Sequence, residues 1–308
     1  MRKGKSLVFL LLVFALLAAA CSRSESETWG GTPKSPDDVV TAPDTLDLDP
    51  EDPETAYIKY GKEIYTDTAT VLPEETGNEL SCASCHATGD SSTTISLIGA
   101  TNNYPAWRPR EDTIFTMEDR INGCMKRSMN GDELDFESKE MRALSAYMKH
   151  ISEGVDEEES DELTGNDAFE EVPEPDVDRG EELFESKSCV NCHATDGSGK
   201  GMTSGPALWG DGSFNDGAGM NRLSDAAGFI KDNMPKSDPG TLNDQEAADL
   251  AAYVLMHDRP VWENHDQDWK DGGRPTDIIT QDRRDAIQEG TFDWTELDNV
   301  IPKEEYKK

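Results

Sequence analysis

The chain has 308 residues, enough for about two ordinary domains. Its formal charge is −35, from 64 acidic and 29 basic residues. A surface this acidic repels phosphate backbones and anionic lipid headgroups, so the charge excludes nucleic acid as a natural partner and disfavours direct binding to acidic membranes.

The first twenty residues have the pattern of an export signal rather than of a folded segment. A basic head that includes Arg2 and Lys3 precedes the apolar run 7–20, which is too short to span a bilayer comfortably. The run ends before Cys21 in a sequence that resembles a bacterial lipoprotein cleavage site, which predicts a signal peptide over 1–20 and a lipid anchor on Cys21. The alternative is an ordinary secretory signal with Cys21 lost or free. Both interpretations predict export to the periplasm or the cell surface.

Two acidic stretches with few large apolar residues divide the rest of the chain. Residues 21–53 predict a flexible acidic tether and residues 156–178 a solvated acidic linker, because such segments cannot bury enough surface to offset their ordering entropy. These stretches leave an N-terminal domain at 54–155, a C-terminal domain at 179–260 and a tail at 261–308. The tail is expected to wrap the domains, and the sequence does not reveal its role.

A C-x-x-C-H run occurs once in each domain, at 82–86 and at 189–193. This spacing is typical of covalent haem attachment, in which two thiols add to the vinyl groups of one haem and the adjoining histidine ligates the iron. A zinc site would need a second ligand pair, and a thioredoxin-like motif would need βαβ surroundings without the histidine. The motifs predict two covalently bound haem c groups, held by Cys82, Cys85 and His86 and by Cys189, Cys192 and His193.

The two domains repeat one plan. Each begins with a helix that contains a glycine, Gly61 or Gly180, and each ends with a helix of pattern E-x-x-x-L-x-A-Y that contains Tyr147 or Tyr253. The glycine would let the first helix cross closely over the aromatic residue of the last one. This layout resembles class I cytochromes c, which implies an all-α fold of two cytochrome c-like domains joined by the acidic linker.

The second haem needs a sixth ligand or an open position. Met234 comes just before the last helix of its domain, where class I cytochromes c place a methionine ligand, and a thioether there raises the reduction potential. Met220 is the rival candidate, with packing in a loop or in the haem crevice as its other role. We expect Met234 to be the ligand.

The first domain has a cysteine close to the position of that methionine in the repeat. Cys124 is the thiol that remains after four cysteines are assigned to thioethers and Cys21 to lipid. A thiolate ligand would stabilise ferric iron and give a low-potential haem beside the higher-potential one. The alternatives are a buried inert thiol or an intermolecular disulfide, with Met125 or Met129 as the ligand of an ordinary electron carrier.

Basic residues gather around this cysteine in a chain that has few of them: Arg108, Arg110, Arg120, Lys126 and Arg127. On a helix, Arg120, Cys124 and Ser128 would share one face because they are four residues apart. An arginine, a thiol and a hydroxyl facing a haem edge suit a small oxyanion, since guanidinium matches pairs of anionic oxygens. The alternative is that these bases balance local acids or haem propionates.

Together these motifs resemble the dihaem thiosulfate dehydrogenases. The resemblance runs from Tyr57 to Pro260 and rests on R-I-N-x-C-x-x-R-S-M-N-G, the first haem motif, and the segments 208–210, 213–220 and 233–235. It implies that His86 and Cys124 ligate an active-site haem. It also implies that Arg110, Arg120 and Ser128 bind substrate, and that the haem of His193 and Met234 passes electrons out.

The resemblance implies an oxidoreductase that joins two thiosulfate ions into tetrathionate and transfers two electrons to an external acceptor such as a cytochrome c. Two haems would hold two electrons, which suits that stoichiometry. The alternatives are a dihaem electron carrier without a substrate of its own and a tetrathionate reductase that works in the reverse direction. The sequence does not fix the direction of the reaction, the electron partner or the oligomeric state.

Overall fold

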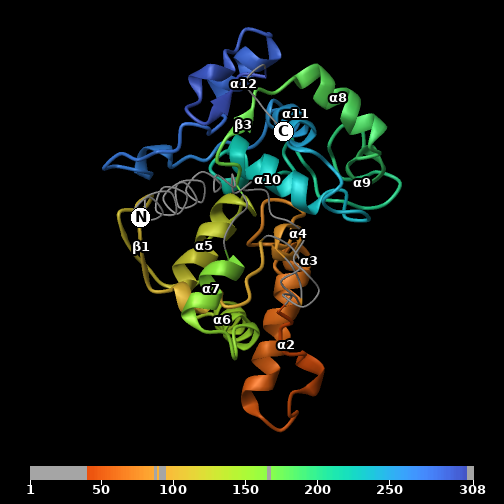
Figure 1. Cartoon of the computed structure of the whole chain (residues 1–308). Helices are drawn as coiled ribbons and strands as arrows, with labels where there is room; N and C mark the ends of the chain where they lie inside the picture. The colour runs from red at the N-terminus through yellow and green to blue at the C-terminus, as the bar shows by residue number, and fades with distance from the viewer. Residues whose placement is uncertain (1–39, 87–88, 90–94, 165–167, 304–308) are drawn as a thin grey trace, which may run out of the picture. The chain divides into compact units, whose positions relative to one another are not determined.

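The structure, a computed structural model, describes residues 40–86, 89, 95–164 and 168–303 (Figure 1). The predicted signal peptide, Cys21 and most of the predicted tether lie outside these residues. Within them, no helix combines the length and the apolar composition that crossing a bilayer requires. All the described residues belong to one compact unit.

Regular structure in the described residues is almost entirely helical, which confirms the predicted all-α class. The helices are α2 Pro53–Thr66, α3 Thr68–Val71, α4 Cys82–Cys85, α5 Met117–Arg127, α6 Lys139–Ile151, α7 Glu157–Thr164, α8 Val177–Ser186, α9 Val190–His193, α10 Leu223–Asn233, α11 Asp244–Leu255 and α12 Gln281–Gln288. Short 3₁₀ turns lie at η2 Thr45–Asp47, η3 Ala100–Asn103, η4 Gly219–Asn221, η5 His265–Gln267 and η6 Trp294–Glu296. Strand β1, Ala106–Arg108, pairs antiparallel with β2, Thr113–Phe115, and β3, Val172–Pro173, pairs parallel with β4, Val300–Ile301.

The repeated plan is visible as two helix crossings, α2 over α6 and α8 over α11 (Figure 1). A Cβ atom on Gly61 would lie 2.0 Å from the carbonyl oxygen of Ala143 and 2.7 Å from the Cβ of Tyr147. On Gly180 it would lie 2.2 Å from the carbonyl oxygen of Asp249 and 2.8 Å from the Cβ of Tyr253. The predicted close approach of glycine to the aromatic residue is confirmed in both halves.

Gly61→Ala should therefore destabilise the N-terminal half by about 3 kcal/mol, because the added methyl group forces the two helices apart. The matched control is Gly212→Ala, since a Cβ there meets only the Cβ of Ala207 at 3.4 Å. Urea unfolding of both holoproteins measures the difference. Equal midpoints for the two variants would contradict this account of the crossing.

The described end of the predicted tether, residues 40–53, is packed rather than free. The backbone of Ala42 donates to Gly89, and Lys62 Nζ lies 3.1 Å from Oγ1 of the buried Thr45. His150 Nε2 lies 3.2 Å from the carbonyl oxygen of Pro43. A few polar and small side chains thus hold this segment against the first half despite its acidic composition.

The predicted acidic linker, residues 156–178, also differs from a solvated segment. It forms α7, in which Ser160 and Leu163 are buried, and it continues into β3, in which Val172 is buried. Asn102 Nδ2 donates to Ser160 Oγ at 2.8 Å. Most residues of this stretch are acidic, and composition alone does not distinguish them from the few side chains that pack against the protein. The exact domain boundaries stay a prediction.

A loop of the second half packs on the C-terminal end of α5. The backbone N–H of Asn215 donates to the carbonyl of Arg127 at 3.1 Å, and its side chain donates to the carbonyl of Lys126 at 2.8 Å. Asn78 Nδ2 donates to the carbonyl of Ser213 at 3.1 Å. The two bonds from Asn215 satisfy carbonyl groups that a helix end leaves unpaired, and together the three bonds bring the loop beside Cys124.

Candidate active site

Helix α5 carries the central residue, Cys124. Thr116 begins the helix with a capping box, in which its side chain accepts from the backbone of Asp119 and its own N–H donates to the Asp119 carboxylate. One turn before the cysteine, Arg120 donates from Nη1 to Cys124 Sγ at 3.0 Å. Ser128 caps the C-terminal end of the helix and lines the same cavities as Cys124.

The surroundings of Cys124 favour its thiolate. Burial raises the pKa of the Cys124 thiol. The charge of Arg120 and a hydrogen bond with His86 lower this pKa by more than burial raises it, and the net pKa is about 6. The thiolate in turn raises the pKa of Arg120. Cys124 is therefore anionic at neutral pH, as a nucleophile or a metal ligand needs to be.

The residues around His86 fit a covalently attached haem. A cavity of about 450 Å³ is lined by Cys82, Cys85, His86 and Cys124. Most of its other walls are apolar: Tyr65, Ile95, Leu97, Ala100, Met117, Ile121, Met125, Met129, Leu144 and Met148. His86 Nδ1 donates to the carbonyl of Ile95 at 3.1 Å, so Nε2 is the ring nitrogen that would ligate iron. His86 and Cys124 both line this cavity and interact with each other, so both would be close enough to hold the haem iron, whereas Met125 and Met129 are buried in the apolar wall.

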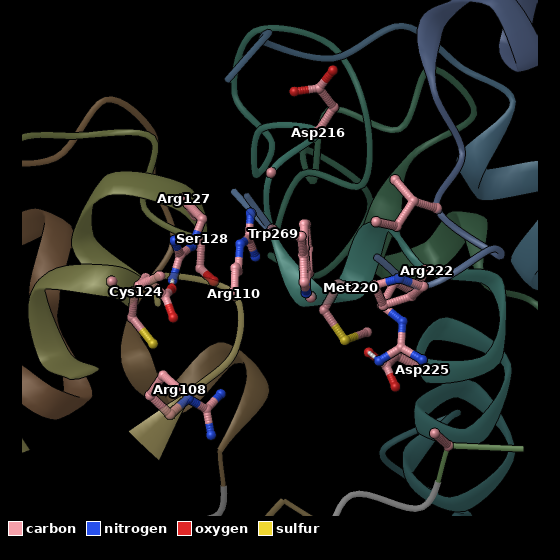
Figure 2. Close-up of a pocket in the computed structure, with 18 of the residues that line it drawn as sticks. Arg108, Arg110, Cys124, Arg127, Ser128, Asp216, Met220, Arg222, Asp225 and Trp269 are labelled. Atoms are coloured by element: carbon pink, nitrogen blue, oxygen red, sulfur yellow. Dashed lines mark hydrogen bonds and ion pairs between the residues drawn. The ribbon is translucent and has the colours of Figure 1, made fainter. Parts of the chain in front are cut away.

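A second cavity, of about 480 Å³, adjoins Cys124 and is lined by arginines (Figure 2). Arg110, Arg127 and Ser128 lie on the side of Cys124, and Met220, Arg222 and Asp225 lie across from them. Arg120 and Arg108 also line it. Burial and the nearby charge of Arg110 lower the pKa of Arg127, so the arginines repel one another and favour an anion among them.

Two arginines on the Cys124 side of this cavity already have acidic partners. Arg110 Nη2 lies 2.6 Å from Asp268 Oδ2, and Arg127 Nη2 lies 3.0 Å from Glu111 Oε1. The Nε atom of Arg110 is buried and has no hydrogen-bond partner within the described part of the chain. A buried donor of this kind is costly to leave unpaired, so it marks a position for an anionic oxygen.

Sequence reasoning missed the contribution of the tail and of the preceding loop to this cavity. Trp269 stacks on the guanidinium of Arg110, with Cζ 4.5 Å from the ring centroid. Asp216 and His265 also line the cavity, and His265 Nε2 lies 2.9 Å from Asp216 Oδ1. Met220, the rival candidate for the second haem, lines this cavity as well. No sequence signal pointed to the tail, because its partners are far away in the chain.

The second haem motif has the same histidine geometry as the first. His193 Nδ1 donates to the carbonyl of Pro206 at 2.9 Å, which leaves Nε2 free for iron. Cys192 is exposed and lies 3.1 Å from Thr203 Oγ1, and Cys189 is partly buried. Met234 caps the end of α10. Burial lowers the pKa of His193, and the positive charge of the nearby Lys236 lowers it to a smaller extent. The two cysteines and the histidine fit a second covalently attached haem, and Met234 as its further ligand stays a prediction.

Comparisons with known proteins agree with this arrangement. Residues 72–156 match the family model "SoxA/TsdA, cytochrome c domain", and residues 177–258 match the family model "Cytochrome c". The chain is 38% identical over 257 residues to a thiosulfate dehydrogenase of Psychrobacter arcticus, covering 82% of this chain and 78% of that protein. It is 37% identical over 212 residues to a thiosulfate dehydrogenase of Allochromatium vinosum, covering 66% and 78%.

A solved structure gives the same picture. The thiosulfate dehydrogenase TsdBA of Marichromatium purpuratum, in its "as isolated" form, matches with a TM-score of 0.64 and 30% identity. The match covers 72% of this chain and 50% of that chain, so this chain spans half the length of that structure. Most of the residues that line the two cavities lie in the segments that the two family models match, whereas the tail residues His265 and Trp269 follow them.

Proposed function

The chain belongs to the thiosulfate dehydrogenase family, and we propose that it joins two thiosulfate ions into tetrathionate and releases two electrons to an external acceptor. The observation that carries this proposal is the anionic Cys124, which Arg120 holds in an arginine-lined cavity next to the histidine of a C-x-x-C-H motif. The haems are proposed to be held by Cys82, Cys85, His86 and Cys124 and by Cys189, Cys192, His193 and Met234.

When bound, the two haems would supply two one-electron acceptors. The proposed bond-forming residue is Cys124. Its sulfur bonds to the outer sulfur of the first thiosulfate, and formation of this bond releases two electrons. The second thiosulfate then attacks the outer sulfur of the adduct through its own outer sulfur, and the Cys124 thiolate leaves as tetrathionate forms. Two thiosulfate dianions thus give one tetrathionate dianion and two electrons, and Cys124 returns to its starting state.

The arginines have a separate task, which is to hold two dianions close together. Two unit charges 4 Å apart repel by about 4 kcal/mol at an effective dielectric constant of 20, and two dianions contain several such pairs. Arg110 and Arg120 would offset this repulsion with charge-assisted hydrogen bonds to the sulfonate oxygens. Ser128, on the same side of the cavity, would add a neutral donor. Together, these three side chains would orient the outer sulfurs of the two thiosulfate ions toward Cys124.

Thiosulfate-dependent haem reduction tests the proposal. Purified, fully haem-loaded protein is mixed with thiosulfate under anaerobic conditions, the haem bands are followed, and tetrathionate is measured with an artificial acceptor present. Reduction with tetrathionate formation supports the enzyme. Haems that stay oxidised with thiosulfate but exchange electrons with a cytochrome c would favour the electron carrier, and catalytic use of tetrathionate alone would favour the reverse reaction.

The location and the electron partner follow from the sequence rather than from the cavity. We infer that the protein is exported and anchored by a lipid on Cys21, and that a cytochrome c or a similar carrier accepts its electrons. The two C-x-x-C-H motifs support this location, because covalent haem attachment in bacteria takes place outside the cytoplasmic membrane. Metabolic labelling with a fatty acid, compared between the natural protein and Cys21→Ser, tests the anchor.

Met234→Ala should slow electron exit without weakening substrate binding. The change removes the proposed thioether ligand of the second haem, and the reduction potential of this haem should therefore fall. The cavity at Cys124 is untouched. We expect kcat to fall by about tenfold with the KM for thiosulfate unchanged. Met202→Ala is the control, because Met202 is 85% exposed. A normal second-haem potential in Met234→Ala would rule out Met234 as its ligand.

A further inference from the structure

The C-terminal tail forms one wall of the arginine cavity, and we propose that Asp268 and Trp269 are positioning residues for Arg110. The tail would then belong to the anion-binding site rather than serve only as a cover for the two halves. This inference rests on the proposed function, because it takes Arg110 to be a donor to the substrate anion.

Arg110 lies in the turn between β1 and β2, where its own element gives it little support. The turn includes Asp112, whose φ of 52° is uncommon for a residue other than glycine. A side chain on such a turn needs contacts from elsewhere if it is to hold one orientation. The described contacts to the guanidinium of Arg110 come from the tail.

Three contacts from the tail fix Arg110 at both ends. The backbone N–H of Trp269 donates to the Arg110 carbonyl at 2.7 Å. Asp268 Oδ2 lies 2.6 Å from Nη2, and the two side chains are only 6% and 16% exposed. The Trp269 ring covers one face of the guanidinium at 4.5 Å from its centroid. A planar cation held by its edge and by its face has little freedom to rotate.

This arrangement also leaves a buried donor of Arg110 for a ligand. Asp268 occupies Nη2, and the neighbouring Nε is buried without a partner in the described structure. The carboxylate therefore turns the guanidinium so that Nε is left for an anionic oxygen. An arginine without this support would spread its donors over several orientations and bind the same oxygen less well.

The tail is itself fastened to the cavity. The backbone N–H of Trp262 donates to Asp216 Oδ1 at 2.6 Å, and His265 Nε2 lies 2.9 Å from the same oxygen. The Trp262 ring lies against Gly217, where a Cβ atom would come within 2.6 Å of it. The wall that carries Asp268 and Trp269 is thus anchored to the loop that lines the opposite side of the cavity.

Tetrathionate binding to the oxidised holoprotein tests the inference without turnover, because no electrons are available to reduce the ligand. Calorimetry gives its Kd, and steady-state thiosulfate oxidation gives kcat/KM. The variants are Trp269→Leu, Trp269→Phe and Arg110→Gln, together with the double variant of Trp269→Leu and Arg110→Gln. Trp107→Leu is the matched control, because Trp107 is 56% exposed and lines neither cavity.

We expect Trp269→Leu to raise the Kd and lower kcat/KM by about tenfold, and Trp269→Phe to stay within about threefold of the natural protein because it keeps an aromatic face. In the Arg110→Gln background, Trp269→Leu should add nothing, since the ring acts through Arg110. Asp268→Asn should likewise have its effect only in proteins that keep Arg110, with the exposed Asp266→Asn as its control.

The outcomes separate this inference from the proposed function. If the natural protein binds tetrathionate and Trp269→Leu behaves like Trp107→Leu, the inference about the tail is overturned and the proposed function is not affected. Additive losses in the double variant would also overturn it, because they would indicate a general structural role. A natural protein that neither binds tetrathionate nor oxidises thiosulfate would overturn the proposed function, and the assignment of Asp268 and Trp269 with it.

Discussion

Cys124→Met should abolish thiosulfate oxidation while both haems stay covalently attached. The proposed haem thioethers use Cys82, Cys85, Cys189 and Cys192, which the substitution does not touch. A thioether in place of the thiolate cannot form the sulfur–sulfur adduct with thiosulfate, so the proposed bond-forming step is lost. It would also raise the potential of the first haem, because a thiolate stabilises ferric iron and a thioether does not.

The measurement combines activity with spectroelectrochemistry. Met125→Leu is the matched control, since it changes the neighbouring buried side chain of the same haem cavity and leaves the thiolate in place. We expect the control to keep a large part of the activity and its first-haem potential. Near-normal oxidation by Cys124→Met would sink the proposed chemistry, and an unchanged potential would show that Cys124 is not the axial ligand.

Arg120→Gln should give the next largest loss. Arg120 donates to Cys124 Sγ at 3.0 Å and lines both cavities, so in the proposed mechanism one guanidinium would serve both the thiolate and the incoming anion. Removing one partner of a buried charged pair leaves the other uncompensated, at a cost of about 3 kcal/mol or more. We expect kcat/KM for thiosulfate to fall by at least about a hundredfold, because the variant lacks both the partner of the thiolate and a charged donor to the substrate.

Two further variants make this result specific. Arg120→Lys keeps the charge but not the planar pair of donors, and we expect an intermediate loss of kcat/KM. Arg142→Gln makes the same chemical change on the exposed side of α6, outside both cavities, and should leave activity unaltered. If Arg120→Gln and Arg142→Gln had equal activity, Arg120 would be neither the partner of the thiolate nor a substrate ligand.

The sequence determined the features that depend on local spacing. The C-x-x-C-H motifs bring two thiols and a histidine together within one short turn, whatever the rest of the chain does. Likewise, the 3.6-residue period of a helix puts Arg120 one turn from Cys124, and this pair is hydrogen-bonded in α5. The two helix crossings were also predictable, because the repeat showed which helices pair and each first helix contains a glycine that allows a close approach.

Only the tertiary structure decided how the arginine-lined cavity is completed. Arg110 and Asp268 are 158 positions apart, and Asn215 reaches Lys126 across 89 positions. No periodicity or motif links such residues, because their contact depends on how loops close over the packed helices. An acid and a tryptophan in an acidic tail look like ordinary surface in the sequence, and they become part of a site only because the fold places them on Arg110.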